Sequence, residues 1–336
     1  MRVTIRKIAK DLQLAVSTVS KALSDSYEIS AETKRRVLEY AEKLDYVPNL
    51  YASKLKQRKS GNIAVVLPEV ADSFFSAAIN GIESIAQTKG YHVIVYLTHE
   101  DLKKQEHILR DFRGGRVDGV LMSVSAGADR NGAIHDLCAK KFPLVFFDRA
   151  CEGVEAAKVL TDDFESGYKA TQHLLSKGCK KIAFLGTSEN LEIINLRGLG
   201  YEKALADAGI KLRKEFILHC NNSEEASYSI IHKMLCAKNR PDGIVGSIEK
   251  LTTLSYTICY DLRLKIARDV KIIGFSSLPF ASLLNPSLTT ITQPAFEMGR
   301  TAATLLFNIL ENKKNEVPNQ QIILPSSLME RSSTRK

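Results

Sequence analysis

The chain has 336 residues, of which 44% are hydrophobic and 25% are charged, as in ordinary globular proteins. This length predicts two or three domains, each able to bury its own core. No apolar run approaches the roughly 18 residues that span a bilayer, and no signal peptide is visible, so we expect a cytoplasmic protein.

The net charge of +9 is concentrated at the N-terminal end of the chain. Residues 1–60 hold 13 Lys or Arg against 7 Asp or Glu, whereas the remaining residues hold 34 against 31. A basic end on a nearly neutral body is typical of a protein that binds the phosphate backbone of nucleic acid. A merely soluble basic surface gives the same count, so charge alone leaves both interpretations open.

The first residues predict two short helices around a tight turn, which is the pattern of a helix-turn-helix DNA reader. Thr4 is the expected N-cap of the first helix, and the second helix covers residues 16–23. Its outward face carries small or hydrogen-bonding side chains, as a helix that enters the major groove requires. These side chains are Val16, Ser17, Ser20 and Lys21.

A third helix begins after the N-cap Ser30 and ends before Pro48, which gives a head of about 46 residues. Residues 49–56 have the composition for two further helical turns, with Asn49 as their cap. Such a short helix is unstable alone in water. The segment is therefore either a basic linker or a hinge that folds only on DNA.

Beyond Gly61, short apolar runs alternate with amphipathic stretches. The predicted strands are residues 62–68, 91–97, 117–123, 143–148, 181–186, 216–220, 243–247 and 270–275. The predicted helices are residues 74–88, 101–113, 131–140, 164–177, 196–208, 224–236 and 250–260. This alternation predicts doubly wound parallel sheets covered on both faces. Because this α/β region is longer than a single sheet normally accommodates, we expect two subdomains with a ligand cleft between them.

Loops at the strand ends are expected to supply the residues that hold a ligand. The candidates are Phe74, Phe75, Ser123, Asp148, Arg149, Arg197, Asn222, Glu249 and Ser276. The two phenylalanines either stack on a sugar face or pack as ordinary helix-start residues. Asp148 either accepts from sugar hydroxyls or pairs with Arg149.

Metal and enzyme motifs are lacking in the sequence. The six cysteines form no metal-ligand spacing, and His99 and His107 lack a third ligand, so we expect free thiols, no metal site and no cofactor. The stretch from Arg197 to Lys203 begins like G-x-G-x-x-G but lacks the third glycine. No P-loop, G-x-S-x-G or H-E-x-x-H motif is present, which argues against an enzyme.

The head and the hinge resemble the LacI/GalR family of bacterial repressors. The resemblance rests on VTIRKIAK, STVSKAL, ISAETKRRVLEYAEKLDYVPN and NLYASKL. It continues in the body through VLTDDFESGYKATQHLLSKGCKKIAFLG, RGLGYEKALADAG, VKIIGF, PSLTTITQP, MGRTAATLL and LPSSLMERSS, and so covers the whole chain. It implies an all-α helix-turn-helix head (1–46), a hinge (47–60) and an α/β periplasmic-binding-protein-like effector domain (61–336).

For DNA binding, the resemblance implies base contacts by Val16, Ser17 and Lys21, and a minor-groove wedge formed by Leu55 with Ala52 on the same face. The full set of expected DNA-binding residues is Thr4, Val16, Ser17, Thr18, Ser20, Lys21, Asn49, Ala52, Leu55 and Lys56. Where the family usually has Gly in the turn and Ser or Pro at the start of the second helix, this chain has Gln13 and Ala15. The geometry of the turn is therefore left open.

For the effector domain, the resemblance implies a clamshell whose chain crosses between the halves near residues 161–162, 291–293 and 323–325. The N-subdomain then covers about 61–161 and 292–323, and the C-subdomain about 162–291 and 324–336. Arg197 matches the family's effector-contacting arginine; the alternative is an exposed helix arginine. No leucine-heptad tail follows, so we expect a homodimer that binds a pseudo-palindromic operator.

Four cleft positions depart from the family pattern. Ile248 and Glu249 replace a common Asn-Asp pair, Ser276 replaces an Asp, and Asn222 replaces a frequent aromatic residue. With the carboxylate at 276 lost, the arginines at 149 and 197 favour a sugar acid or phosphosugar as the effector. We therefore predict an allosteric DNA-binding regulator, most often a repressor in this family, with a clamshell sugar-binding protein that does not bind DNA as the alternative.

Overall fold

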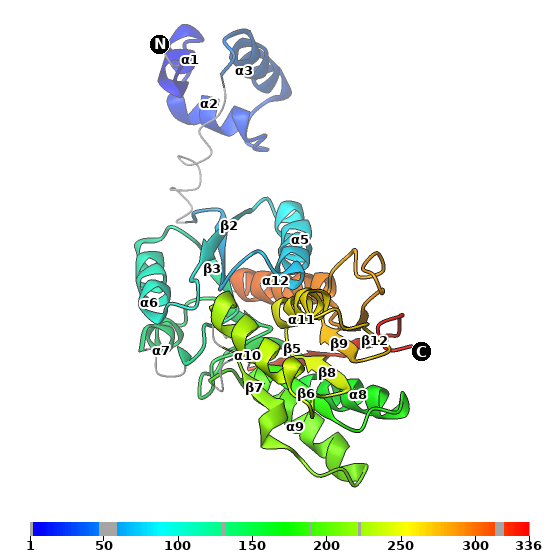
Figure 1. The fold of residues 1–336 in the computed structure, drawn as a ribbon. Helices are drawn as coiled ribbons and strands as arrows, with labels where there is room; N and C mark the ends of the chain where they lie inside the picture. The colour runs from blue at the N-terminus through cyan, green and yellow to red at the C-terminus, as the bar shows by residue number, and fades with distance from the viewer. Residues whose placement is uncertain are drawn as a thin grey trace. The chain divides into compact units, whose positions relative to one another are not determined.

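The computed structural model describes residues 3–46, 59–128, 132–187, 190–220, 223–312 and 319–335. The chain divides into two compact units, residues 1–60 and 61–336 (Figure 1). The expected hinge contacts Asn49, Ala52, Leu55 and Lys56 and the expected cleft residue Asn222 lie outside the described residues.

The described part of the N-terminal unit contains three helices, α1 (Ile5–Asp11), α2 (Val16–Leu23) and α3 (Ala31–Lys43). Apolar side chains from all three form one small core, which includes Ile8, Val19 and Val37. Thr4 caps α1 by accepting a hydrogen bond from the backbone N–H of Lys7. The turn between α1 and α2 places Gln13 in the left-handed region, at φ 54°, where glycine is the residue best suited.

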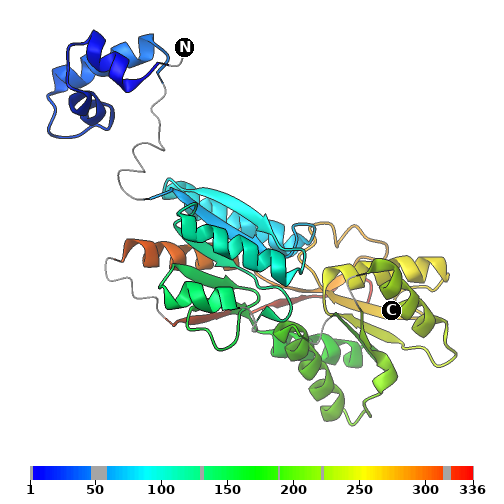
Figure 2. The same ribbon diagram turned by 90° about the vertical axis from the view of Figure 1, so that its left-hand side faces the viewer.

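The described residues of the second unit form two six-stranded sheets (Figures 1 and 2). The first sheet has the order β11-β5-β4-β3-β1-β2, and the second has the order β12-β10-β9-β8-β6-β7. The strands of the first sheet are β1 (Asn62–Leu67), β2 (His92–Leu97), β3 (Gly119–Met122), β4 (Leu144–Phe147), β5 (Ala157–Thr161) and β11 (Gln321–Leu324). Those of the second are β6 (Ile182–Gly186), β7 (Ile217–His219), β8 (Gly243–Gly246), β9 (Lys271–Phe275), β10 (Thr289–Thr292) and β12 (Ser327–Met329). All described pairings are parallel except that of β12 with β10.

Each sheet is covered by helices on both faces, and successive residues of a strand face opposite cores. Within β1, Ile63 and Val65 pack under α5 (Ser73–Thr88) and α12 (Ala295–Glu311), whereas Ala64 and Val66 pack under α6 (Leu102–Asp111) and α7 (Gly132–Ala139). The second sheet packs against α8 (Asp163–Ser176) and α9 (Glu192–Asp207) on one face, and against α10 (Glu224–Cys236) and α11 (Glu249–Asp261) on the other. Two short 3-10 helices cover Phe112–Gly114 and Lys214–Phe216.

The chain passes between the two sheets three times, after β5, after β10 and after β11. We call the half around the first sheet the N-subdomain and the half around the second sheet the C-subdomain. The crossing segments are bonded to one another. The side-chain amide of Gln293 donates to the Thr161 hydroxyl (3.2 Å), and the backbone N–H of Ser326 donates to the Asp162 carboxylate (2.7 Å).

The last described residues are held in the C-subdomain. The Ser333 hydroxyl donates to the carbonyl oxygen of Ile272 (2.7 Å) and accepts from the backbone N–H of Thr289 (2.8 Å). The Thr334 hydroxyl is hydrogen-bonded to His173 Nε2 (2.8 Å). Ser333 and Thr334 are fully buried, so the C-terminal segment is part of the core of this half.

Several elements differ from the sequence expectation. Helix α9 begins at Glu192, four residues before the predicted start, and β5, β10, β11, β12 and α12 were not predicted as elements. The missed strands have three to five residues. Buried and half-buried positions alternate in β5, and exposed and half-buried positions alternate in β11, so neither strand is a continuous buried run. Short strands of this kind lack the continuous apolar run that predicts a buried strand.

Candidate nucleic-acid interface and effector cleft

Helix α2 presents an outer face of small or hydrogen-bonding side chains. Val16, Ser17, Ser20 and Lys21 are exposed, while Val19 and Ala22 are buried against the other two helices. This division is the one expected for a recognition helix, because the exposed face must approach base edges closely. Thr18 is half-buried and Thr4 is exposed.

Lys21 forms a salt bridge with Glu28, and both side chains are about half exposed. An exposed pair of this kind contributes little to stability, so a phosphate or a guanine can replace Glu28 as the partner of Lys21. Tyr27, which precedes Glu28, is 92% exposed and was not singled out from the sequence. The available signal was an aromatic residue flanked by polar residues directly after the second helix.

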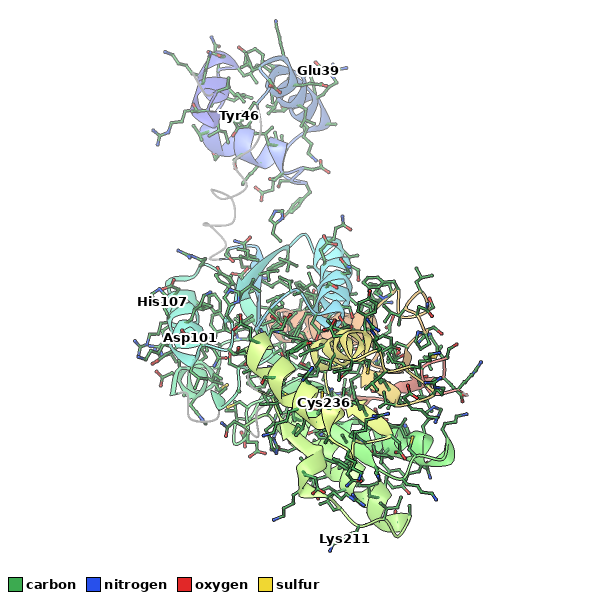
Figure 3. The ribbon with its side chains drawn as sticks, in the orientation of Figure 1. Glu39, Tyr46, Asp101, His107, Lys211 and Cys236 are labelled. Atoms are coloured by element: carbon green, nitrogen blue, oxygen red, sulfur yellow. The ribbon has the colours of Figure 1, made fainter. Side chains whose placement is uncertain are left out.

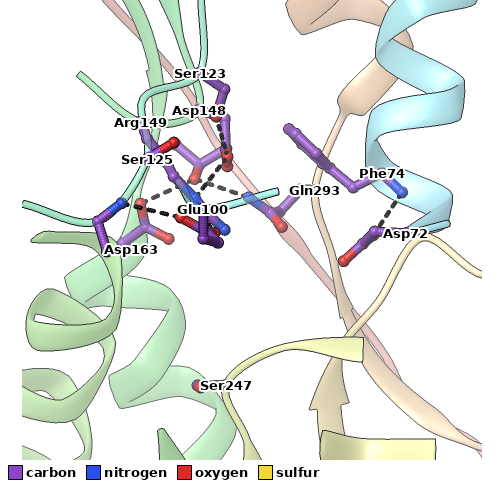
Figure 4. Close-up of polar contacts among 12 residues, drawn as sticks. Asp72, Phe74, Glu100, Ser123, Ser125, Asp148, Arg149, Asp163, Ser247 and Gln293 are labelled. Atoms are coloured by element: carbon purple, nitrogen blue, oxygen red, sulfur yellow. Dashed lines mark hydrogen bonds and ion pairs between the residues drawn. The ribbon is translucent and has the colours of Figure 1, made fainter. Parts of the chain in front are cut away.

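The two subdomains enclose an inner cavity of about 30 Å³. Its lining includes the predicted residues Phe74, Phe75, Asp148, Arg149, Arg197, Glu249 and Ser276. A larger cavity of about 280 Å³ shares Asp72, Phe75, Arg149 and Ile248 with it. Ser123 does not line the inner cavity; it is buried behind it and donates to Asp148 (3.1 Å; Figure 4).

Arg197 lies within helix α9 and not on a strand-end loop, and with 2% of its surface exposed it is not the exposed helix arginine of the alternative. Its Nε donates to Asp163 (2.7 Å), and its Nη1 donates to the carbonyl oxygen of Ser247 (2.6 Å). Its guanidinium lies 4.0 Å from the ring centre of Phe275. The other terminal nitrogen, Nη2, is buried at the cavity with no hydrogen-bond partner among the described residues.

The approach of α8 to α9 brings Arg197 to its partner. A β-carbon on Gly167 of α8 would lie 2.1 Å from the carbonyl oxygen of Arg197, so the helices can touch only because this residue is glycine. Asp163 is the first residue of α8. Burial raises the pKa of Asp163 to about 6, although Arg197 acts to lower it.

Arg149 is also engaged by carboxylates. Its Nη1 donates to Glu100 (2.6 Å), and its Nε lies 3.6 Å from Asp148 (Figure 4). Burial opposes ionisation of the Arg149 guanidinium, but Glu100 and Asp148 outweigh it and raise its pKa. Burial raises the pKa of Asp148, against the influence of Arg149. Asp148 pairs with Arg149 and also lines the inner cavity, so the two interpretations of Asp148 are compatible.

The carboxylates at the other end of the cavity come from opposite subdomains. Asp72 caps α5 by accepting from the backbone N–H of Phe74 (2.9 Å), and Glu249 opens α11. Burial, followed by the charge of Glu249, raises the pKa of Asp72 to about 6. Within the described part of the chain, neither carboxylate forms a salt bridge.

Phe74 and Phe75 are almost fully buried, and their rings meet edge-to-face with centroids 5.3 Å apart. Phe75 also contacts Phe147 of β4 in the same manner. Both residues belong to the core of the N-subdomain and line the cavity as well. The two interpretations of this pair are therefore compatible.

Four residues of the cleft were not proposed from the sequence, namely Asp72, Glu100, Asp163 and Gln293. Asp72 was detectable as an N-cap before the Phe-Phe pair. The other three act through partners 34, 49 and 132 residues away, which sequence spacing does not reveal. Glu100 and Asp163 are carboxylate partners of Arg149 and Arg197, so both arginines are paired with acidic residues in the fold.

Among the described residues, no group of three His, Cys, Asp or Glu side chains has the proximity to hold a metal ion, and no helix is long and apolar enough to cross a membrane. All six cysteines are free thiols. Figure 3 labels His107 on α6 and Cys236 on α10, which belong to different subdomains.

The comparisons with known proteins agree with this architecture. The model of bacterial regulatory proteins of the lacI family matches residues 4–49, and that of the periplasmic binding protein-like domain matches residues 171–334. The chain is 30% identical to the HTH-type transcriptional regulator RegA of Clostridium saccharobutylicum, over 99% of this chain and 100% of that one.

Solved structures share the fold over the full length. The lac repressor dimer bound to operator and the anti-inducer ONPF aligns with a TM-score of 0.87 at 21% identity, covering 100% of both chains. The complex of the transcriptional regulator CelR with cellobiose aligns with a TM-score of 0.74 at 22% identity, covering 99% of this chain and 100% of that one. The chain has a helix-turn-helix head, a two-sheet body and a relative, RegA, that is 30% identical over its full length. It therefore belongs to the lacI family of bacterial regulatory proteins and is a DNA-binding transcriptional regulator, not an enzyme.

Proposed function

We propose that this regulator is a repressor that binds a pseudo-palindromic operator as a homodimer under the control of a small, neutral, hydroxyl-rich effector. The observation that carries the proposal is the presence, in one chain, of a head with an exposed polar α2 face and a body with a polar cavity between two halves. A regulator of this kind acts in the cytoplasm, where bacterial DNA lies. In this proposal residues 1–46 form the head, 47–60 the hinge and 61–336 the effector domain.

Direct base contacts are assigned to the exposed face of α2, through Val16, Ser17 and Lys21. The remaining contacts are assigned to Thr4, Thr18 and Ser20 in the head and to Asn49, Ala52, Leu55 and Lys56 in the hinge. The basic charge of residues 1–60 supports the backbone part of this interface.

Selection of genomic fragments on the full-length chain tests the DNA-binding proposal. We expect one enriched, two-fold symmetric sequence, which Ser17→Glu abolishes by placing a carboxylate on the recognition face. Arg35→Glu on the exposed side of α3 is the control, because it removes more positive charge but lies outside the proposed contacts. Enrichment of no sequence over bulk DNA, or a larger loss with Arg35→Glu, contradicts the proposal.

Effector contacts are assigned to Phe74, Phe75, Asp148, Arg149, Arg197, Glu249 and Ser276, with Ser123 supporting Asp148 and with Asn222 at the cleft. Both arginines already face carboxylates, whereas Asp72 and Glu249 add negative charge to the same cavity. An anionic effector would therefore be repelled, and we propose a neutral polyol in place of a sugar acid or phosphosugar. The fold relative CelR forms a complex with cellobiose, which is a neutral sugar.

Calorimetry with matched pairs of probes, such as glucose with glucuronate and cellobiose with cellobionate, tests the charge argument. We expect any binding to favour the neutral member of a pair. Tighter binding of the acid member by wild-type protein contradicts the neutral effector without affecting the assignment of DNA binding.

For the homodimer, we assign the contact surface to exposed apolar side chains of the C-subdomain. Tyr260 at the end of α11 is 84% exposed, and Leu283 in the loop after β9 is 82% exposed. The two segments are joined by the hydroxyl of Tyr256, which donates to the carbonyl oxygen of Pro286 (3.0 Å). In sedimentation measurements we expect Leu283→Glu to favour the monomer and the control Ile323→Glu, on β11, to leave the dimer intact; equal behaviour refutes the assignment.

A further inference from the structure

The side chain of Glu249 bridges the two subdomains across the cleft. Glu249 is the first residue of α11 in the C-subdomain, and 8% of its surface is exposed. One carboxylate oxygen accepts from the backbone N–H of Ser73 (3.2 Å), and the other accepts from the Ser73 hydroxyl (2.5 Å). Ser73 is the first residue of α5 in the N-subdomain.

Within its own half, Glu249 is held by the hydroxyl of Ser276, which donates to the carboxylate oxygen that also accepts from the Ser73 hydroxyl (2.5 Å). Ser276 follows β9, so the carboxylate is fixed from the end of the sheet as well as by its own helix. A buried carboxylate needs such donors, because it has lost its hydration and has no salt-bridge partner among the described residues.

The N-terminus of α5 is a favourable place for this negative charge. The first N–H groups of a helix have no partner inside the helix, and the helix dipole attracts an anion there. Asp72 satisfies the N–H of Phe74, and Glu249 satisfies that of Ser73. One of the two caps of α5 is therefore supplied by the opposite subdomain.

The bridge also limits the space available to a ligand. The inner cavity, at about 30 Å³, has room for about one water molecule. A molecule the size of a sugar does not fit this space unless lining side chains move or the subdomains separate, and Glu249 is a lining side chain that contacts both subdomains.

We propose that Glu249 acts as a clamp that holds the two subdomains together, and that an effector must displace this clamp to enter the inner cavity. The contacts of the clamp involve residues of this chain alone, whereas its displacement by an effector rests on the proposed function. Glu249 is thus a positioning residue, acting on the N-subdomain through Ser73.

A distance across the cleft tests the clamp directly. Spin labels are attached to the native, exposed Cys236 on α10 and to a cysteine replacing the exposed Lys104 on α6, in a Cys138→Ser background. The labelled chain is mixed with excess unlabelled chain, so each measured distance lies within one chain. We expect Glu249→Ala to shift the distances to longer values, and Glu249→Gln, which keeps an acceptor oxygen, to restore most of the wild-type distribution.

Ser73→Ala provides a second, milder variant with a matched control. It removes one contact to Glu249 but leaves the backbone N–H, so we expect a broader distance distribution and about tenfold faster hydrogen exchange in the first turn of α5. Ser76→Ala is the control, since the hydroxyl of Ser76 is exposed and bonds only to the backbone of its own helix among the contacts described.

The proposal is overturned if Glu249→Ala keeps the wild-type distances while remaining folded. If Glu249→Ala fails to fold, identical distances and exchange for Ser73→Ala and Ser76→Ala overturn it instead. Neither result bears on operator selection, so failure of the clamp and failure of the proposed function are separate outcomes.

Discussion

Replacing Arg197 by methionine tests the buried ion pair at the base of the cleft. Methionine retains much of the length and apolar packing of arginine against Phe275 but removes the charge. Asp163, which is 3% exposed on its side chain, then loses its cationic partner, and the carbonyl oxygen of Ser247 loses a donor.

The magnitude follows from the burial of both partners. Removing one member of a buried pair costs about 3–5 kcal/mol of unfolding free energy, because the other charge stays buried without compensation. Protonation of Asp163 limits this cost. Its pKa is already raised to about 6 in the wild type, and loss of Arg197 raises it further.

A carboxyl group with a raised pKa in the folded state destabilises the fold as pH increases from its unfolded pKa through its folded pKa. The variant therefore loses less stability at pH 5 than at pH 8, by about 1.4 kcal/mol for each unit of additional pKa shift. Urea unfolding of the full chain, followed by far-UV circular dichroism at both pH values, measures the difference.

Asp163→Asn in the Arg197→Met background is the control. It removes the uncompensated charge, so we expect stability to recover at pH 8 and the additional pH dependence to vanish. Equal losses at pH 5 and pH 8 for the single variant, or no recovery in the double variant, would show that the cost comes from lost packing and not from the buried charge.

Three further predictions rest on single contacts. Lys21→Ala should weaken binding to the selected operator by about 1–3 kcal/mol in fluorescence anisotropy, whereas an equal loss on random DNA would show that Lys21 contacts only phosphate. Gly167→Ala should lower the melting temperature, because its β-carbon would meet the backbone of α9. Gly198→Ala is the control and should be neutral or stabilising, since its β-carbon would lie 3.5 Å from the nearest atom of Phe184. Similar melting temperatures for the two variants would contradict the close approach of α8 to α9. Ser333→Ala should cost about 1–3 kcal/mol in chemical unfolding by leaving buried backbone groups unpaired, and a change below measurement error would refute that role.

Much of the fold was predictable because its strongest signals are local. Strands such as β1 and β9 are continuous apolar runs between turn residues, and α5 has both an N-cap and a following glycine. The short edge strands β11 and β12 contain exposed residues and derive their structure from pairing with distant strands. Such pairing carries no local pattern.

The candidate site divides in the same way. The residue types of the cleft were predictable, and most of the proposed side chains lie around one cavity. The ion pairs that these side chains form could not be predicted, because they join residues far apart in the sequence. Arg149 and Arg197 indicated an anion site in the sequence, whereas in the fold their charges are balanced by Glu100 and Asp163.

The bonded crossing segments have a mechanical consequence for this regulator. Because Gln293 donates to Thr161 and Ser326 donates to Asp162, the three connections between the halves are joined to one another, and a change of angle between the halves would involve all three. The second unit begins at Gly61, directly before the amino end of β1. The inner cavity lies at the carboxyl ends of the strands, on the opposite edge of the sheet. A rotation about the crossing segments would therefore displace Gly61 further than the residues that line the cavity.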